Sequence, residues 1–400
     1  MRPTTADAVE DAVATAAAHG RTLEVRAGGS KVGLGNPIQA HDVLDLSALS
    51  GIVDYDPAEL VLTARAATPM SEIDAALRAR GQHLAFEPPD YRRLLGGGGA
   101  PTLGGVLASN LSGPRRIAAG AARDHFLGLH AVSGRGQVFK SGGRVVKNVT
   151  GYDLSKLLAG SFGTLAVLTE VTVKVMPAPE DCCTVLVLGL SAESAVELLC
   201  AMTALPLDIT GLAHLPNGLA ARSGVRLVAG AECPITALRL EGIAVSVGAR
   251  LLRLREAIVE RGARHDDTAI LGPEDTEMLW GEIRDGLLLP PGVVWKVSVP
   301  PAEGARVAAA IAARQHCDVL YDWAGGLLWV ALHGQSASPD SVRGVLARSG
   351  GHATLVRAPM SERERCPAFQ PLSGPLRALS QRVKHAFDPV GVLNPGRMVS

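Results

Sequence analysis

The sequence predicts an α+β protein with two domains and a short C-terminal segment. The chain has 400 residues, enough for two or three domains at roughly 150 residues each. Hydrophobic residues make up 47% and charged residues 20%, so the chain can bury a large core. A proline-containing stretch at 177–180 separates strands and glycine loops from a region where strands alternate with alanine-rich helices. We therefore expect one domain at 1–177, a second at 181–365 and a tail at 366–400.

In the first domain, the periodicity of apolar residues predicts helices and short strands. Helical spacing of apolar side chains predicts helices at 5–19 and 69–80. A shorter helix is expected at 150–158. Runs of β-type residues predict strands at 22–26, 42–46, 51–55, 60–66 and 164–175. Residues 126–133 and 137–141 are expected to pair as a hairpin across a Gly-Arg-Gly turn.

The second domain has a different pattern, in which predicted strands and helices follow one another. The expected strands are 184–190, 225–229, 293–299 and 327–332. The expected helices are 192–204, 302–314 and 341–348. This order is typical of an α/β sandwich of the split βαβ kind. The tail contains a further predicted helix at 375–387.

Charge and cysteine content exclude several classes of protein. Lys plus Arg is 39 and Asp plus Glu is 39, which argues against nucleic-acid binding by bulk electrostatics. The six cysteines are scattered, without C-x-x-C or zinc-ligand spacing, so we expect no metal site and no iron–sulfur cluster held by this chain alone. Residues 1–20 form an amphipathic pattern unlike a signal peptide, and no run of 18 apolar residues is present. These features predict a cytoplasmic protein.

The first glycine loop follows the predicted strand at 22–26. It contains Ala27, Gly28, Gly29, Ser30, Lys31 and Gly35. Glycines let a backbone approach a ligand closely, and consecutive N–H groups in such a turn bind anions. The loop matches neither the P-loop nor the Rossmann fingerprint. Taken alone, it is either a phosphate site or an ordinary surface turn.

A second glycine cluster favours the phosphate site. Residues 101–110 have the pattern of a helix that starts after a glycine loop and is rich in small residues, including Thr102, Gly104, Gly105 and Ser109. A helix N-terminus of this kind binds anions. The two clusters together suit the two phosphates of one dinucleotide. We interpret Gly96–Gly99, which precedes the second cluster, as a flexible loop.

Three further stretches make the chain resemble a known family. They are Ser112-Gly113-Pro114-Arg115-Arg116 through Asp124, Lys147-Asn148-Val149-Thr150-Gly151-Tyr152-Asp153-Leu154, and the terminal run from Phe387 to Arg397. With the glycine loops they resemble the FAD-binding domain of the vanillyl-alcohol oxidase / para-cresol methylhydroxylase (PCMH) superfamily. The finer match is to the FAD-binding (E) subunits of glycolate oxidase, also called glycolate dehydrogenase. The resemblance implies a two-subdomain PCMH-type domain, an α/β cap domain, and a C-terminal segment that returns to the flavin.

The resemblance also assigns candidate FAD-binding residues. It implies that Gly28–Lys31, Gly104, Gly105, Ser109 and Gly113 line the pyrophosphate. It places Gly163 and Val167 along the adenosine half and Asn394 near the isoalloxazine, with Tyr152 and Asp153 bracing the loop nearby. The full predicted set also includes Ala27, Gly35, Thr102 and Gly151. Ser30 stands where some members carry a histidine that links flavin covalently, so we expect noncovalent FAD.

Substrate residues are only partly present. Related flavin dehydrogenases of 2-hydroxy acids carry an Arg segment and a Lys segment, which correspond here to Arg284 and Lys296. Both side chains suit a small carboxylate, although a solvated helix arginine and a strand-edge lysine are equally compatible with the pattern. Where relatives carry a histidine-rich metal motif, this chain has 321–329, which contains no histidine. We therefore expect no metal.

The flavin machinery thus looks complete and the alcohol-oxidising machinery incomplete. This combination favours a subunit of a glycolate oxidase complex, with a homologous FAD subunit and an iron–sulfur subunit that carries electrons away. Partner subunits would account for any attachment at the inner face of the membrane. The alternatives are a stand-alone FAD-dependent 2-hydroxy-acid dehydrogenase and a non-catalytic scaffold. The missing Rossmann fingerprint argues against an NAD enzyme.

Overall fold

The computed structural model describes residues 1–144 and 151–398, and its chain forms two compact units. The first unit comprises Met1–Ser112, Gly120–Ala178 and the chain from Pro371 onward. The second comprises Pro179–Gln370 and the short segment Gly113–Ala119. The chain passes from one unit to the other inside the stretch expected at 177–180. The sequence did not indicate that 113–119 belong with the second unit.

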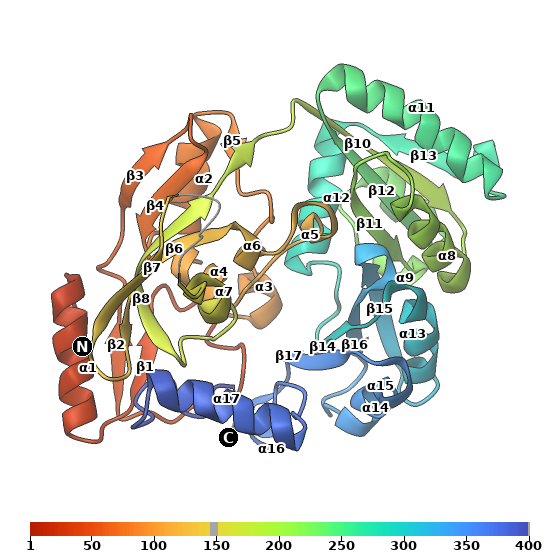
Figure 1. The fold of residues 1–400 in the computed structure, drawn as a ribbon. Helices are drawn as coiled ribbons and strands as arrows, with labels where there is room; N and C mark the ends of the chain where they lie inside the picture. The colour runs from red at the N-terminus through yellow and green to blue at the C-terminus, as the bar shows by residue number, and fades with distance from the viewer. Residues whose placement is uncertain (145–150, 399–400) are drawn as a thin grey trace. The chain divides into compact units, whose positions relative to one another are not determined.

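A five-stranded antiparallel sheet is the centre of the first unit (Figure 1). Its strands, in spatial order, are β3 (Ile52–Asp56), β4 (Val61–Arg65), β8 (Ala166–Lys174), β6 (Phe126–Ser133) and β7 (Val138–Gly142). The predicted hairpin is confirmed, since β6 and β7 pair from Gly128 with Gly142 to Val132 with Val138. Strands β6 and β8 are buried on both faces because they lie at the middle of the sheet.

A smaller sheet carries the first glycine loop. Strand β1 (Leu23–Arg26) pairs in parallel with β2 (Asp42–Asp45) on one side. On its other side Leu23 forms a parallel bridge with Leu393 of the tail. Thr5 caps the N-terminus of helix α1 (Ala6–Ala18), because its side chain accepts the N–H of Ala8. The apolar face of α1 joins Leu23 and Leu393 in one hydrophobic cluster.

The remaining short elements of the first unit surround the sheet. They are α2 (Met70–Arg78), α3 (Arg92–Leu95), α4 (Leu103–Ala108), α6 (Ala122–His125) and α7 (Leu154–Leu158), with β5 (Gln82–His83) paired to β9 (Met176–Pro177). The helix predicted at 150–158 begins only at Leu154, and residues 151–153 are not helical. The motif residues 147–150 lie outside the described residues.

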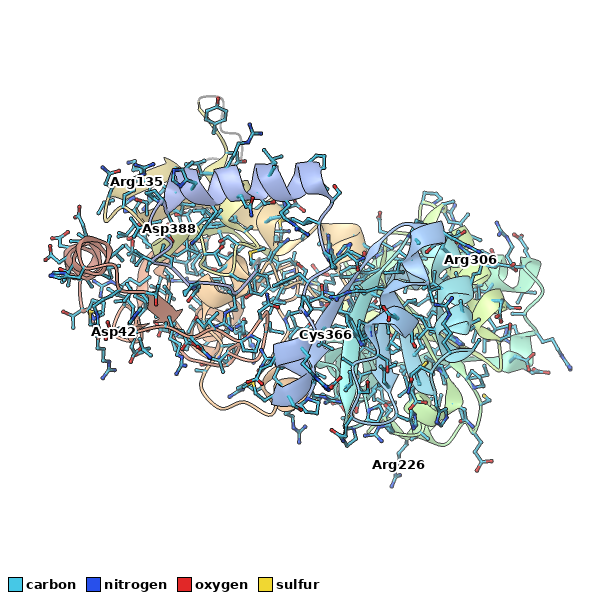
Figure 2. All side chains as sticks on the ribbon, turned by 90° about the horizontal axis from the view of Figure 1, so that it is seen from below. Asp42, Arg135, Arg226, Arg306, Cys366 and Asp388 are labelled. Carbon is cyan, nitrogen blue, oxygen red and sulfur yellow. The ribbon has the colours of Figure 1, made fainter. Side chains whose placement is uncertain are left out.

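The C-terminal segment is fastened by one buried carboxylate. Helix α17 (Gly374–Phe387) ends at Asp388, whose side chain is fully buried. That carboxylate accepts the N–H groups of Gly391, Val392 and Leu393 at 2.8–3.0 Å and the ammonium of Lys384 at 2.5 Å. Figure 2 shows Asp388 and Arg135 near one end of α17, where Arg135 donates to the carbonyl of Ala386. This clamp directs the tail along β1.

The second unit contains an eight-stranded antiparallel sheet (Figure 1). The strands are β10 (Asp181–Leu188), β11 (Ile209–Leu215), β12 (Ile235–Gly242), β13 (Thr268–Leu271), β14 (Val293–Ser298), β15 (Cys317–Asp322), β16 (Leu327–Leu332) and β17 (His352–Arg357). Their spatial order is β13-β10-β12-β11-β15-β16-β14-β17. Only β10, β14 and β16 were predicted from the sequence, and the other five strands were not.

The helices of the second unit confirm the predictions at 192–204 and 302–314, whereas the helix predicted at 341–348 is divided into two by a turn at 344–345. The helices of this unit are α5 (Arg116–Ala119), α8 (Ala192–Thr203), α9 (Asn217–Ala220), α10 (Arg226–Ala229), α11 (Ala244–Glu260), α12 (Pro273–Asp285), α13 (Gly304–Ala312), α14 (Pro339–Arg343), α15 (Leu346–Ser349) and α16 (Met360–Arg365). The strand predicted at 225–229 is wrong: its buried residues, Val225 and Val228, are three apart, which is helical spacing. Within the described part of the chain, none of the helices is both long and apolar enough to cross a membrane.

The two faces of the second sheet differ in character. Since side chains alternate along a strand, each strand contributes one set of residues to each face. One face is apolar and packs against α8, α11 and α13, with Val297 and Val330 among its core residues. The opposite face carries polar groups, among them Arg239, Asp322 and Lys296. Buried polar groups need hydrogen-bond or charge partners. We therefore expect any functional site of the second unit to lie on this polar face.

Candidate functional site

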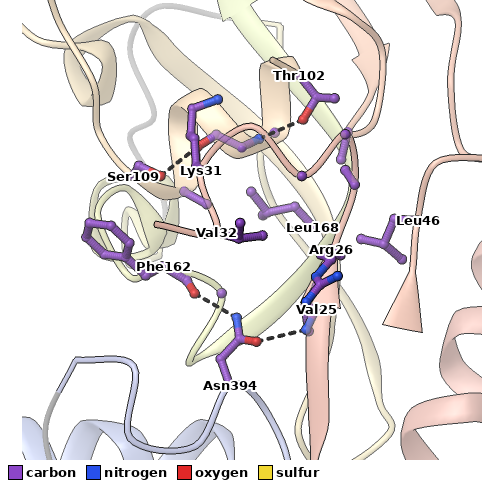
Figure 3. Close-up of a pocket in the computed structure, with 18 of the residues that line it drawn as sticks. Val25, Arg26, Lys31, Val32, Leu46, Thr102, Ser109, Phe162, Leu168 and Asn394 are labelled. Atoms are coloured by element: carbon purple, nitrogen blue, oxygen red, sulfur yellow. Dashed lines mark hydrogen bonds between the residues drawn. The ribbon is translucent and has the colours of Figure 1, made fainter. Parts of the chain in front are cut away.

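A pocket in the first unit lies where the glycine loop, α4 and the tail meet (Figure 3). It contains about 830 Å³ of empty space, including the part open to solvent. Apolar side chains, among them Val32, Leu46 and Leu168, form part of its wall. The predicted residues that line it are Ala27, Gly28, Gly29, Ser30, Lys31, Thr102, Gly104, Gly105, Ser109, Gly163 and Asn394. The structure therefore brings most of the predicted cofactor residues into one place.

The first glycine loop is interlocked with the run Gly96–Gly99. A Cβ atom on Gly28 would lie 1.8 Å from the carbonyl oxygen of Ala100. A Cβ atom on Gly99 would lie 1.7 Å from the carbonyl oxygen of Gly28. Only two glycines allow this approach of backbone to backbone. The expectation of a merely flexible loop is thus wrong for Gly99, because this residue supports the pocket loop.

Helix α4 presents its N-terminus to the same pocket. The Thr102 hydroxyl caps the helix by accepting the N–H of Gly105. Gly104 packs against β4, since its N–H donates to the Ala66 carbonyl and a Cβ atom would lie 2.7 Å from Ala66. The Ser109 hydroxyl donates to the Gly105 carbonyl. The N–H groups of Leu103 and Val106 also donate within the protein, to the carbonyls of Thr68 and Thr102. These contacts fix the N-terminus of α4, with its partial positive charge, at the pocket wall.

Lys31 supplies a positive charge at this wall. Its ammonium lies 3.3 Å from the Ser30 hydroxyl oxygen and 3.6 Å from where a Cβ atom of Gly105 would be. Burial lowers the pKa of Lys31 to about 8, against the opposing charge of Asp90. A cation beside a helix N-terminus is unfavourable unless an anion lies between them. The position of Lys31 therefore indicates a site for a negatively charged group.

Two tail residues complete the pocket. The Asn394 side-chain oxygen accepts the N–H of Val25 at 2.8 Å, and its amide nitrogen donates to the Phe162 carbonyl at 2.8 Å (Figure 3). Arg397 donates to the carbonyls of Val32 and Leu34 at 3.1 and 3.0 Å. The sequence did not point to Arg397, whose role depends on residues more than 360 positions away.

Several predicted residues have other roles in the structure. Gly35 has a φ of +75°, and a Cβ atom there would lie 2.8 Å from the Arg397 side chain, so Gly35 makes room for the tail. Val167 is a fully buried core residue. Gly113 belongs to the second unit, where its carbonyl accepts the Trp323 indole N–H. Asp153 caps α7, and the Tyr152 side chain next to it is 89% exposed.

One pair of expectations is not compatible with the structure. Gly163 was expected along the adenosine half and Asn394 near the isoalloxazine. A Cβ atom on Gly163 would lie 2.8 Å from the Asn394 amide nitrogen, so the two residues are neighbours. Neighbouring residues meet the same part of an extended dinucleotide. The assignment of these two positions to opposite ends of the cofactor therefore does not hold.

The two predicted substrate residues have different surroundings. The Arg284 guanidinium forms two 2.8 Å hydrogen bonds with the Asp285 carboxylate. The Lys296 ammonium lies 5.2 Å and 5.5 Å from the ring centroids of Trp323 and Trp329. Burial, followed by the charge of Arg116, lowers the pKa of Lys296 to about 8, against the charge of Asp322. Among the residues that the structure describes, no three His, Cys, Asp or Glu side chains gather in a group able to hold a metal ion.

The residues of the pocket fit a dinucleotide such as FAD. Gly28, Gly99 and Gly104 let the segments of the pocket wall pack closely, because a Cβ atom on any of them would overlap Ala100, Gly28 or Ala66. Backbone N–H groups and Lys31 match a pyrophosphate. The apolar wall suits an aromatic ring system. These three features are together in one pocket.

Comparison with known proteins agrees with this geometry. An FAD-binding domain family matches residues 1–142. The glycolate oxidase subunit GlcE of Escherichia coli (strain K12) is 35% identical over 380 residues, which is 94% of this chain and 92% of that protein. The glycolate oxidase subunit GlcD of Bacillus subtilis (strain 168) is 32% identical over 161 residues, 40% of this chain and 34% of that protein.

Solved structures share the fold over nearly the whole chain. p-Cresol methylhydroxylase with bound substrate gives a TM-score of 0.71 at 15% identity. 4-Ethylphenol oxidase from Gulosibacter chungangensis, in complex with isoeugenol, gives 0.72 at 14% identity. Both matches cover 99% of this chain and 88% of the other. The predicted PCMH-type α+β fold is confirmed.

Proposed function

The chain belongs to the family of glycolate oxidase subunits that includes GlcE, and we propose that it binds FAD noncovalently within a complex that oxidises glycolate. A similar small 2-hydroxy acid, such as D-lactate, is an equivalent substrate in this proposal, and the product is the 2-oxo acid. The observation that carries the proposal is the pocket of the first unit, in which a glycine cradle, an α4 N-terminus and Lys31 meet.

Each part of the pocket has a defined task in this proposal. The N–H groups of the 27–31 loop hold the pyrophosphate beside the N-terminus of α4, and the Lys31 ammonium neutralises part of its charge. Asn394 and Arg397 keep β1 and the loop in place. Ser30 is not a residue of the kind that links flavin covalently in this superfamily. Bound FAD supplies the hydride acceptor, whereas the chain positions the flavin and the substrate relative to each other.

The partners follow from family membership. A glycolate oxidase subunit works in a complex, and the similarity to GlcD supports a second, homologous FAD subunit as one partner. An iron–sulfur subunit is the other partner in the proposal, and it receives the electrons. Lys296, with Arg284 as the sequence predicted, binds the substrate carboxylate.

The test uses the full chain purified alone. Flavin released on denaturation is identified by chromatography, and anaerobic glycolate is then added to the native protein. We expect released FAD, and bleaching of the flavin absorbance by glycolate only after the partner subunits are added. Bleaching without partners would support the stand-alone dehydrogenase, and a chain without flavin would support the scaffold. Acetate, which has no hydroxyl to oxidise, serves as the matched control.

The pKa of Lys31 predicts how FAD affinity depends on pH. Below about pH 8 the ammonium is charged in the free protein, and above it the charge is lost. A bound pyrophosphate stabilises the charged form, so affinity stays constant below about pH 8 and falls as pH rises above it. With an ordinary lysine pKa in the complex, affinity at pH 9.5 is expected to be roughly 30-fold lower than at pH 7.

Fluorescence titration of FAD into the flavin-free chain measures this effect. Lys31→Arg is the control, because a guanidinium stays charged across this range. We expect its affinity to change little with pH. An equal loss of affinity in the wild type and in Lys31→Arg would show that another group is responsible.

A further inference from the structure

Helix α11 carries apolar side chains on two opposite sides. One side packs against β10 and β12 and belongs to the core of the second unit (Figure 1). On the other side, Val245 is 84% exposed, Leu252 63% and Val259 44%. Because every seventh residue returns to the same side after about two helical turns, these three form one stripe along the helix. An exposed apolar stripe of this kind is typical of a surface that meets another protein.

The N-terminal half of α11 exposes no charged side chain between 243 and 252. Its exposed residues, with the N-cap, are Ile243, Ala244, Val245, Ser246, Gly248, Ala249 and Leu252. Arg250 is the one charged residue in this stretch, and it donates to the carbonyls of Leu207 and Glu241 within the unit. A face without exposed cations favours an apolar protein surface over a membrane with anionic headgroups.

Gly248 lies in the middle of this uncharged half. A glycine inside a helix lowers the stability of the helix relative to alanine. Packing within the described chain does not require it, since a Cβ atom at Gly248 would have no heavy atom within 4 Å. The missing side chain leaves a flat patch beside Leu252, where a second helix can approach closely.

The two ends of α11 are electrostatically complementary. The N-cap, Ile243, makes no side-chain hydrogen bond to the helix, and the first turn contains no acidic residue. The N–H groups of that turn therefore keep their partial positive charge without a carboxylate from their own helix. The C-terminal half and its C-cap expose Arg253, Glu256, Glu260 and Arg261, so carboxylates are available at the opposite end.

We propose that α11 pairs in antiparallel orientation with α11 of a second copy of this chain, about a two-fold axis at Leu252. Val245 and Val259 are equally distant from Leu252 along the chain, so each comes level with the other valine of the second copy. The same symmetry brings Glu256 of the second copy level with Gly248, toward the positive end of the helix. A partner of different sequence would not require this symmetry, which favours a second copy as the occupant.

The proposed interface is small and does not involve the flavin. One pair of helices buries less surface than a standard interface, so we expect a dissociation constant of roughly 10–100 µM. The pairing needs neither FAD nor glycolate, and its test is therefore separate from that of the proposed function.

Sedimentation velocity of the full chain between about 1 and 200 µM tests the association. We expect a shift from one copy to two across this range. Leu252→Glu is expected to weaken association at least 100-fold, because two carboxylates would meet in an apolar seam. Leu376→Glu, at a leucine of α17 that is 54% exposed, is the matched control and is expected to associate normally.

Gly248→Leu separates the interface from the stability of the helix. Leucine favours a helix more than glycine does, so the melting temperature at about 1 µM, where the chain is a single copy, is expected to rise. Association is expected to weaken at least 10-fold, since the new side chain occupies the flat patch. A defect in folding would lower both quantities together.

Disulfide trapping tests the orientation, with the wild type as the control for the native cysteines. Leu252→Cys is expected to form a covalent dimer on oxidation, because the residue meets its own copy on the two-fold axis. Val245→Cys alone is expected to form none, whereas an equal mixture of Val245→Cys and Val259→Cys is expected to form one.

Three results would overturn the proposal. They are a single copy at all concentrations of the wild type, normal association in Leu252→Glu, and trapping of Val245→Cys with itself, which would show a parallel arrangement. If the wild type does not self-associate but binds another subunit of its complex, and Leu252→Glu loses that binding, the stripe belongs to that subunit and the second copy is rejected.

Discussion

Replacing Gly28 by alanine is expected to reduce the FAD content of the purified chain at least tenfold. The added Cβ atom would lie 1.8 Å from the backbone oxygen of Ala100, and a backbone atom cannot swing aside as a flexible side chain can. The loop 27–31 must move, which carries its N–H groups and Lys31 away from α4. Overpacking of this kind also lowers the free energy of unfolding, by about 1–3 kcal/mol.

Gly98→Ala is the matched control for this prediction. Gly98 lies in the neighbouring glycine run, and a Cβ atom there has no heavy atom within 4 Å. Its FAD content and melting temperature are expected to equal those of the wild type. Flavin released from equal amounts of each protein measures the content, and thermal denaturation measures the stability. Normal flavin content in Gly28→Ala would show that the interlocked loops do not hold the cofactor.

Replacing Asp388 by alanine is expected to release the C-terminal segment from the first unit. The substitution leaves three backbone N–H groups and the Lys384 ammonium without their acceptor. Each buried hydrogen-bond donor that loses its acceptor costs about 1–3 kcal/mol. The tail that carries Asn394 and Arg397 then loses its contacts with β1, so FAD affinity falls as well.

Two measurements separate the release of the tail from general unfolding. Urea denaturation gives the free energy of unfolding. Limited trypsin digestion reports access to Arg377 and Arg382 on α17, and we expect rapid cleavage there in Asp388→Ala only. Asp11→Ala, at an exposed position of α1, is the control and is expected to behave like the wild type. A protected tail in Asp388→Ala would contradict the clamp.

Elements with a strong local pattern were predictable from the sequence. Helices α1, α2, α8 and α17 have one apolar face, and the hairpin β6–β7 has a turn between two β-type runs. Strands β11, β12, β13, β15 and β17 were missed, and the first two of them are buried along nearly their whole length. A strand that is buried on both faces lacks the alternation that identifies it. The segment of α10 was predicted as a strand because it contains β-branched valines. Its helical spacing rests on only two buried positions, Val225 and Val228.

The residues of the candidate site also divide into those that the sequence predicted and those that it did not. Its glycine loops were predictable, because glycines, serine and lysine after a strand form a local pattern that is typical of phosphate-binding turns. The contributions of Gly99 and Arg397 were not, because each depends on a partner distant in the sequence. Gly99 fits against Gly28, and Arg397 reaches residues 32–36. The sequence alone cannot show which distant segments meet.

The place of the tail along β1 also sets the order of events during synthesis. Asn394 follows its partner Val25 by 369 residues, and a ribosome adding about 5–20 residues per second needs roughly 20–70 s to reach it. Through that interval β1 lacks its second neighbour, and the loop of Lys31 lacks Arg397. The nascent chain thus lacks a finished pocket through that interval, so we expect flavin to be acquired only after the tail has been synthesised. A chain that stops before α17 is expected to accumulate without cofactor and with an open strand edge that promotes aggregation.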